Sequence, residues 1–317
     1  MNFQNIEYFL AAAEAGNITR AAEKLQISQQ ALSSHIARME EELGCRLFER
    51  RQGLELTYGG KKYKEAAEKM LDIQKQSVTM LNDISSNMRG ELRIGISYTR
   101  GQAILPLLLP DFTEKYPLAE LSVLEGSTEN LERRLEHGDI DVLIGFAPFM
   151  FEGAHSYDLM KEHLYLVLPK SLLRKHFGEE SRVAEALQQF ESAHDLSIFR
   201  EFPFVLLKEG DRIRNIADSA FREAGFRPEI KFETSNTQTA VALAAEGLGV
   251  TICPELYLRS NYIASGGPDS YIRSLVEVCP LFDESRSDII AVGYNKNRYL
   301  SRLAADFIQM SIEKLRS

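Results

Sequence analysis

Residues 18–44 read ITRAAEKLQISQQALSSHIARMEEELG, and this stretch decides the fold of the N-terminal region. Its first half contains the small pair Ala21-Ala22, which lets two helices approach closely. Gln26 and Ile27 form a short turn, and Ser28 is a good helix N-cap. The second half places apolar residues on one helix face, at Leu32, Ile36, Met39 and Leu43. Two helices joined by a short turn, the second having one apolar and one polar face, form a helix-turn-helix.

The polar face of the second helix has side chains that suit the edges of DNA bases. Gln pairs with adenine, Arg pairs with guanine, and Ser donates or accepts a hydrogen bond. An ordinary solvated face has the same periodicity, so the pattern alone leaves both interpretations open. The candidate DNA-binding residues of this motif are Thr19, Ser28, Gln29, Gln30, Ser33, Ser34 and Arg38.

The flanking segments extend the motif in both directions. Upstream, a helix with one apolar face is expected to end at Gly16-Asn17, and Thr19 is expected to cap the next helix. Downstream, Leu54 and Leu56 alternate with Glu55 after a Gln52-Gly53 turn signal, which predicts a small hairpin, or wing. Two basic residues at the tip of this hairpin suit phosphates or the minor groove, namely Arg50 and Arg51.

A long helix without Pro is predicted over residues 58–88. Two sets of positions repeat every seven residues along it and predict a coiled-coil seam with a polar centre. A lone surface helix would not need such a repeat, so the pattern favours a dimerisation helix. The two sets are Tyr63, Met70, Ser77 and Ile84, and Ala67, Gln74, Leu81 and Met88.

From Gly90 onward the sequence predicts the order β-α-β-α-β twice, once over residues 92–146 and again over 204–253. In each copy a cluster of Ser, Thr or Asn residues opens the second helix. We expect two similar α/β lobes with a cleft between them. Ligands of open α/β sheets bind at the carboxyl ends of strands, near helix N-termini.

Candidate effector-binding residues lie at the predicted strand ends. Arg100 is expected in the loop that leaves the first strand, where it could clamp a carboxylate, so we expect an anionic effector. Each polar residue has a plainer interpretation as a cap or loop residue, and aromatic residues near strand ends are often core. The candidates are Ser97, Tyr98, Thr99, Arg100, Ser127, Thr128, Phe146, Phe204, Asn236 and Thr237.

The N-terminal residues resemble the winged helix-turn-helix of LysR-type transcriptional regulators. The resemblance rests on fixed spacings at Phe9-Leu10, Ala21-Ala22, Leu25, Ser28-Gln29, Ala31-Leu32-Ser33, Ile36, Glu40, Leu43-Gly44, Leu47-Phe48, Arg50, Leu56-Thr57 and Gly60. It continues more loosely at Leu105-Pro106, Phe112, Tyr116-Pro117, Gly138, Asp141, Glu246-Gly247-Leu248-Gly249-Val250 and Pro254. Departures from the family pattern at Asn17-Ile18, Gln30 and Ser34-His35 put the operator sequence in doubt, because those positions are expected to face DNA.

The resemblance implies an all-α winged helix-turn-helix and a long linker helix, followed by a two-lobed α/β effector domain similar to periplasmic solute-binding proteins. The expected domains are 1–57 for DNA binding, 58–89 for dimerisation and 90–317 for regulation. Lobe 1 is expected at about 90–162 and 269–317, and lobe 2 at about 163–268. The implied partners are a double-stranded DNA operator, a second copy in a homodimer or homotetramer, a small-molecule co-inducer and, for an activator, RNA polymerase.

Composition and motif content narrow the classes of function that remain open. The net charge of −9 lies entirely outside residues 1–89, whose charges cancel. We expect no export signal, no membrane span, no other cofactor, no metal site and a cytoplasmic location. The sequence has no common catalytic motif, so an enzyme is not expected. The alternatives are a thiol-redox regulator using Cys45, Cys253 or Cys279, and a ligand-independent DNA-binding protein.

Overall fold

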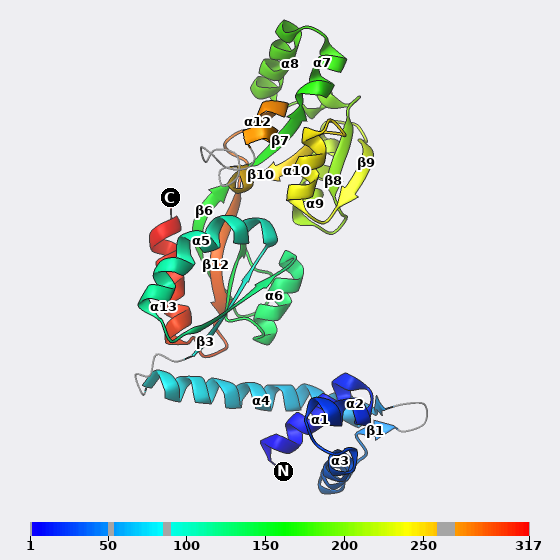
Figure 1. Cartoon of the computed structure of the whole chain (residues 1–317), viewed down its shortest axis with the longest axis vertical. Helices are drawn as coiled ribbons and strands as arrows, with labels where there is room; N and C mark the ends of the chain where they lie inside the picture. Colours follow the sequence, from blue (N-terminus) through cyan, green and yellow to red (C-terminus); the bar gives the residue numbers. More distant parts are fainter. Residues whose placement is uncertain (1, 50–53, 85–89, 259–269, 317) are drawn as a thin grey trace. The chain divides into compact units, whose positions relative to one another are not determined.

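The computed structural model describes residues 2–49, 54–84, 90–258 and 270–316 (Figure 1). The chain divides into two compact units, Met1–Asn87 and Met88–Ser317. The first unit holds the predicted DNA-binding motif and the long helix, and the second holds the predicted lobes. Within the described ranges, none of the helices combines the length and the apolar character that a membrane crossing requires.

The first unit is a winged helix-turn-helix followed by a long helix. Its elements are α1 (Phe3–Ala15), α2 (Ile18–Lys24), α3 (Gln29–Leu43), β1 (Phe48–Glu49), β2 (Glu55–Leu56) and α4 (Tyr58–Ile84). Strands β1 and β2 pair antiparallel and form the expected hairpin.

Of the two helix caps predicted in this unit, Ser28 is confirmed and Thr19 is wrong. Ser28 caps α3, because its hydroxyl accepts a hydrogen bond from the Ala31 amide at 3.1 Å. The prediction that Thr19 caps α2 is wrong. The N-cap is Asn17, two residues earlier, whose side chain accepts from the Arg20 amide at 3.1 Å, and Thr19 therefore lies inside the helix.

The core of the first unit lies between its helices. Ala21 and Ala22 are fully buried there, as expected for a pair of small residues at a close helix contact. The apolar face of α3 contributes Leu32, Ile36 and Met39, which are 0–1% exposed. The first turns of α4 also join this core, through Tyr63, Ala67 and Leu71.

Lobe 1 of the second unit is built on a five-stranded sheet of order β4-β3-β5-β12-β6. Strands β4, β3 and β5 are parallel, whereas β12 and β6 run antiparallel to their neighbours. The residues of α5 and α13 pack in one core cluster with β3, β5 and β12, while those of α6 pack in another. The elements are β3 (Glu91–Ile96), α5 (Tyr98–Lys115), β4 (Glu120–Glu125), α6 (Thr128–His137), β5 (Val142–Phe146), β6 (Ala154–Glu162), β12 (Asp288–Asn295) and α13 (Arg302–Leu315).

Lobe 2 contains a three-stranded sheet of order β10-β7-β11 and a parallel pair, β8 and β9. An isolated bridge between Phe204 and Val250 links the two groups of strands. The elements are β7 (Leu164–Pro169), α7 (Lys170–Phe177), α8 (Glu180–Ala193), the 3-10 helix η1 (Leu196–Phe199), β8 (Pro203–Leu207), α9 (Arg212–Glu223), β9 (Glu229–Thr234), α10 (Thr237–Ala245), β10 (Thr251–Pro254), α11 (Glu255–Leu258), α12 (Ser270–Leu275) and β11 (Val276–Pro280).

The chain crosses between the lobes twice, and both crossovers matter for the site below. It leaves lobe 1 between β6 and β7, at His163, and returns between β11 and β12 (Figure 1). The crossover from lobe 2 back to lobe 1 lies later in the chain than the sequence predicted. The segment from 269 was expected in lobe 1, but β11 pairs with β7 in the sheet of lobe 2. Both predicted β-α-β-α-β orders are present, as β3-α5-β4-α6-β5 and β8-α9-β9-α10-β10.

Candidate DNA-binding surface and ligand site

Helix α3 presents its polar face to solvent. Gln29, Gln30, Ser34 and Arg38 are exposed, while Ser33 is half-buried. The opposite face is buried in the core of the first unit. The helix is therefore held by its apolar side and leaves donors and acceptors free along the other, which is the geometry that groove reading requires.

Thr19 lies beside this face although it caps nothing. Its hydroxyl donates to Oε1 of Gln29 at 3.2 Å, so the start of α2 contacts the start of α3. His35 instead turns inward. Its Nδ1 lies 3.1 Å from Oδ1 of Asn5, and its ring packs edge-on against Tyr8. The expectation that position 35 faces DNA is therefore wrong.

The wing is fixed by hydrogen bonds that were not predicted, although their residues are among those that carry the family resemblance. One carboxylate oxygen of Glu40 accepts from the amides of Leu47 at 2.7 Å and Phe48 at 3.0 Å. On the other side, the Thr57 hydroxyl donates to the Arg46 carbonyl at 2.7 Å and accepts from the Gly60 amide at 2.9 Å. These bonds tie the hairpin to α3 and α4. The predicted phosphate contacts Arg50 and Arg51 lie outside the described residues.

The apolar residues of α4 serve two purposes. Tyr63 and Ala67, which were assigned to the dimer seam, pack into the core of their own unit instead. Further along the helix, an exposed apolar stripe remains. Its members and their exposed fractions are Met70 36%, Ile73 64%, Val78 52%, Met80 43% and Leu81 64%. Ile73, Val78 and Met80 were not in the predicted seam. Met88 lies outside the described residues.

Three helix N-termini in the second unit carry the predicted ligand residues. Ser97 and Ser127 occupy the N-cap positions of α5 and α6, but neither side chain caps its helix. The two helices begin at the same edge of the lobe 1 sheet, where the Gly126 amide donates to the Ile96 carbonyl at 3.3 Å. Asn236 does cap α10 in lobe 2, since its side chain accepts from the Thr239 amide at 3.0 Å.

The two lobes meet at these N-termini. The Thr99 hydroxyl of α5 donates to the Thr237 hydroxyl of α10 at 3.2 Å. Thr237 is buried, Tyr98 is 54% exposed, and Thr128 is half-buried at the start of α6. The structure therefore brings the candidates of α5 and α10 into direct contact across the lobe boundary.

Arg100 is not the free loop residue that the sequence suggested. It lies in the first turn of α5, is only 3% exposed, and forms an ion pair with Glu162. Its Nη1 donates to the Ser97 hydroxyl at 3.1 Å. Helix α5 begins at Tyr98, earlier than predicted, and this turns the side chain inward. Glu162 was not predicted, because nothing around it in the sequence marks a ligand-site residue.

The two predicted aromatic wall residues differ in position. Phe146 lies between two guanidinium groups, that of Arg100 at 3.9 Å and that of Arg212 at 4.2 Å from the ring centre. Arg212 belongs to lobe 2 and donates to Asp288 of lobe 1 at 2.7 Å. Both rings are buried, Phe146 at 2% and Phe204 at 0% exposure, but Phe204 lies inside the core of lobe 2, edge-on against Phe221. The prediction that Phe204 binds the effector is therefore wrong.

The electrostatics around Glu162 are set by burial. Removal from water raises the pKa of its carboxyl, and the carboxylates of Asp288 and Glu255 act in the same direction, whereas Arg100 lowers it. Arg100 Nε and Glu162 Oε1 are buried atoms without a hydrogen-bond partner among the described residues. The pair therefore joins through one bond rather than through the two-bond fork that guanidinium and carboxylate can form.

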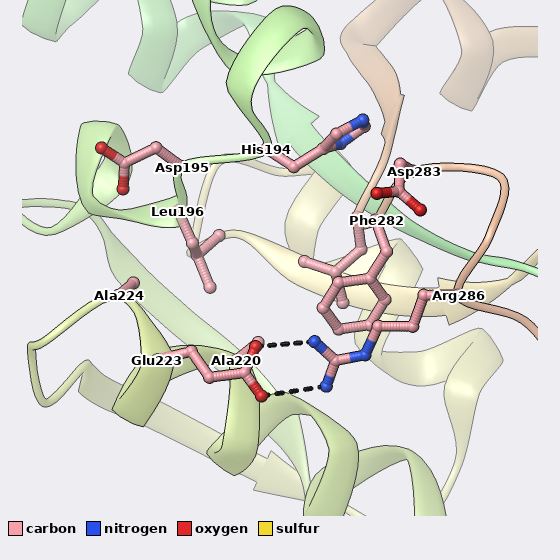
Figure 2. A pocket seen from close by; sticks show the side chains of 10 residues that line it. His194, Asp195, Leu196, Ala220, Glu223, Ala224, Phe282, Asp283 and Arg286 are labelled. Carbon is pink, nitrogen blue, oxygen red and sulfur yellow. Dashed lines mark hydrogen bonds and ion pairs between the residues drawn. The ribbon is translucent and has the colours of Figure 1, made fainter.

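A cavity of about 270 Å³ lies elsewhere, in lobe 2. Figure 2 shows its lining side chains, with the bidentate pair Arg286–Glu223 on one side and His194 and Asp283 on another. Leu196 and Leu281 form part of its apolar surface. None of the predicted effector residues lines it.

The cysteines differ in accessibility. Cys45 is exposed, whereas Cys253 and Cys279 are buried. Burial raises the pKa of the Cys279 thiol to about 12, and it raises that of Cys253 further, with Glu162 adding to the effect. Both buried cysteines stay protonated and unreactive at neutral pH. Among the described residues, no group of His, Cys, Asp and Glu is arranged to hold a metal ion.

Comparison with known proteins matches both units. Residues 3–61 match the family model "Bacterial regulatory helix-turn-helix protein, lysR family", and residues 85–316 match the model "LysR substrate binding domain". The uncharacterized HTH-type transcriptional regulator YcgK of Bacillus subtilis is 30% identical and covers 100% of this chain and 95% of its own. The HTH-type transcriptional regulator ClcR of Pseudomonas putida is 34% identical over 80% of this chain and 83% of its own.

Solved structures with the same fold include full-length regulators. CbnR complexed with its target DNA superposes with a TM-score of 0.65 at 24% identity, covering 99% of this chain and 100% of that one. OxyR from Pseudomonas aeruginosa gives 0.63 at 22% identity, covering 99% and 95%. Because the two family models match both units and the relatives are transcriptional regulators rather than enzymes, this chain belongs to the LysR family of DNA-binding transcriptional regulators, with an effector-binding domain.

Proposed function

We propose that α3 reads operator sequence in the major groove. The observation that supports this most directly is its exposed row of polar side chains over a buried apolar face. Base preference is assigned to Gln29, Gln30, Ser33, Ser34 and Arg38, while Thr19 and Ser28 border the groove. Arg50 and Arg51 are assigned to phosphate attraction, because a hairpin tip beside the motif suits the DNA backbone.

The test is Arg38→Ala with Lys24→Ala as its control. Both variants remove one exposed positive charge, but Lys24 ends α2 and pairs with Glu14. Losing a bidentate base contact costs about 1–3 kcal/mol of binding free energy and relaxes the sequence preference at one base pair. Losing a phosphate contact lowers the slope of log affinity against log salt concentration by roughly one. Fluorescence anisotropy on an operator found by genome-wide footprinting gives both quantities. If Arg38→Ala leaves affinity and preference unchanged, the assignment of Arg38 is wrong.

The active species in this proposal is a homodimer through α4, or a homotetramer made of two such dimers. The exposed apolar stripe of α4 supports pairing with a second copy, because isolated apolar residues at this spacing would otherwise contact water. A dimer places two α3 helices against two half-sites of one operator. The role of RNA polymerase as a partner depends on whether the regulator activates.

A small anionic metabolite, of the carboxylate class, is the proposed effector, bound between the two lobes. The observation that carries this is the contact of Thr99 with Thr237, which joins two helix N-termini from different lobes. Helix N-termini present unpaired amide groups and the positive end of the helix dipole. Ser97 and Ser127 leave the first amides of α5 and α6 without a side-chain cap, whereas Asn236 caps α10. The proposed binding residues are Ser97, Tyr98, Thr99, Ser127, Thr128, Asn236 and Thr237, with Phe146 as a wall.

Binding there would change how the lobes pack, and hence the spacing of the two DNA-binding units. A ligand that prefers one lobe arrangement by a few kcal/mol is sufficient to shift the population. This distinguishes the proposal from a ligand-independent DNA-binding protein, whose footprint no small molecule changes. The redox alternative is left with Cys45, because the other two thiols are buried with raised pKa values.

Calorimetry on the full chain with a panel of organic acids and their neutral amides tests the ligand. The Thr128→Ala, Asn236→Ala double variant should lose most of the carboxylate affinity. Ser301→Ala is the control, because Ser301 caps α13 outside the proposed site and its loss also costs helix stability, about 1 kcal/mol. Binding confined to neutral compounds, or undiminished carboxylate binding by the double variant, would contradict the proposal.

A further inference from the structure

The buried pair Arg100–Glu162 stands at the point where the chain first leaves lobe 1. Glu162 is the last residue of β6, and the next residue, His163, precedes the first strand of lobe 2. The side chains of Arg100 and Glu162 are 4% and 1% exposed. The pair therefore joins the first turn of α5, which carries the proposed ligand residues, to the crossover between the lobes.

Each partner has unused hydrogen-bonding capacity. Arg100 directs Nη2 to Glu162, Nη1 to Ser97 and the face of its guanidinium to Phe146. Its Nε–H has no partner, and neither has Oε1 of Glu162, among the described residues. A buried polar atom without a partner is unfavourable, so the present pairing does not satisfy either side chain completely.

The charges facing Glu162 come from several elements. Arg100 of α5 is its partner, while Asp288 of β12 and Glu255 of α11 are the acidic groups that act on it. The Cys253 thiol of β10 also faces it and is uncharged. The guanidinium of Arg212 in α9 packs on the Phe146 ring, on which Arg100 also packs, and forms an ion pair with Asp288. A negative charge on a ligand would therefore meet Arg100 only after that side chain leaves Glu162.

We propose that Glu162 is a built-in counter-ion of the ligand site, which holds Arg100 in an ion pair and thereby sets how strongly the site binds a carboxylate. A ligand carboxylate that reaches Arg100 replaces Glu162 as its partner. The inference rests on the proposed site between the lobes and adds the residue that controls its charge selectivity. Displacing a buried carboxylate is unfavourable, and this cost lowers the affinity for anions.

The decisive variant is Glu162→Gln, which keeps an acceptor oxygen for Arg100 and removes the charge. Calorimetry with succinate, pyruvate and benzoate should give a dissociation constant lower by about tenfold or more than for the wild type. Succinamide and benzamide, which are neutral, should change by less than about twofold. The Glu162→Gln, Arg100→Gln double variant should lose the gain, because both members of the pair are then neutral.

Glu180→Gln is the matched control, because it frees Arg174, and helices α7 and α8 carry none of the proposed ligand residues. The side chains of Arg174 and Glu180 are 65% and 90% exposed, so solvent screens them and no comparable gain is expected. Lowering the pH gives a second readout. Since the pKa of Glu162 is raised, its protonation should strengthen carboxylate binding in the wild type at a pH where Glu162→Gln shows no such change.

The outcomes separate this inference from the proposed function. If the wild type binds a carboxylate and Glu162→Gln binds it no more tightly, the counter-ion role is wrong while the site between the lobes stands. If no carboxylate binds either protein, both are contradicted. Circular dichroism shows whether Glu162→Gln is folded. Should the unpaired Arg100 unfold it, the pH dependence of the wild type, and its absence in the double variant, decide the question.

Discussion

At the scale of single residues, Gly60 and Gly59 form a natural pair for a test of the wing. A Cβ on Gly60 would lie 2.0 Å from the Leu47 carbonyl oxygen, a backbone atom that cannot move alone. That carbonyl accepts from the Thr57 amide at 2.9 Å and so fixes the end of the hairpin. A Cβ on Gly59 would have ordinary contacts at 3.7–3.8 Å.

We therefore expect Gly60→Ala to lower the free energy of unfolding of the first unit by about 1–3 kcal/mol, as overpacking does. Gly59→Ala should change it by less than about 1 kcal/mol, and in the stabilising direction, because Ala is the better helix former. Urea unfolding followed by circular dichroism measures both. Operator affinity should fall only for Gly60→Ala. Equal tolerance of the two substitutions would show that the Leu47 carbonyl does not constrain α4.

For the ligand site, the sequence was least informative about the burial of individual side chains. The helix-opening residues Ser127 and Asn236 could be found, because Ser and Asn at the start of a helix are local signals. Ser97 was expected in a loop, because the start of α5 was placed too late. The burial of Arg100 could not, because its partner Glu162 is far away in sequence and belongs to another element. Phe204 was misplaced for a similar reason. An aromatic residue near the start of a strand gives no sign of which face of the sheet will be covered.

At the scale of elements, α4 shows what a heptad pattern can and cannot predict. The seven-residue repeat correctly indicated a long amphipathic helix, but it did not reveal that the first turns pack against α1. Phe9 contacts the Tyr63 ring, so the seam available to a partner begins later along the helix. Ile73 and Met80, seven residues apart, belong to that stripe, and Ile73 is as exposed as Leu81.

We expect Ile73→Asp and Leu81→Asp to weaken the dimer strongly, because each would place a carboxylate in an apolar contact. Binding to a two-half-site operator should weaken with it, by up to tenfold for each ~1.4 kcal/mol of dimer stability lost. Lys75→Asp is the control, because Lys75 is exposed and lies outside the stripe. This substitution changes the charge of the helix more than Ile73→Asp or Leu81→Asp does, and the dimer should nevertheless persist. Sedimentation velocity measures the assembly. Variants at Ile73 and Leu81 that sediment as the wild type would rule out this face of α4.

At the scale of the whole molecule, the sequence predicted the order of elements in both lobes better than it predicted the boundary between them. Each β-α-β-α-β run is consecutive in the chain, so periodicity and turn signals reveal it. The position at which the chain returns from lobe 2 to lobe 1 depends on the sheet that β11 joins. Strand β11 pairs with β7, which lies more than a hundred residues earlier, and therefore belongs to lobe 2. Long-range pairing leaves no local signal, and the boundary was therefore placed too early.

The two units should unfold separately. Among the described residues, the apolar cluster of the first unit contains no residue of the second, and none of the four clusters of the second unit draws on the first. Calorimetric unfolding of the full chain should then show two transitions. A carboxylate that binds between the lobes at a hundred times its dissociation constant stabilises its unit by about 2.7 kcal/mol, which raises that Tm by roughly 5–10 °C.

Operator DNA provides the complementary measurement. It should raise the transition of the unit that contains α3 and leave the other in place, while the carboxylate does the reverse, because each ligand stabilises only the unit that binds it. The Thr128→Ala, Asn236→Ala variant should keep the response to DNA and lose the response to the carboxylate. If a single ligand raises both transitions together, the units are coupled in stability. The effector would then act through a shared core contact rather than by changing how separately stable units are spaced.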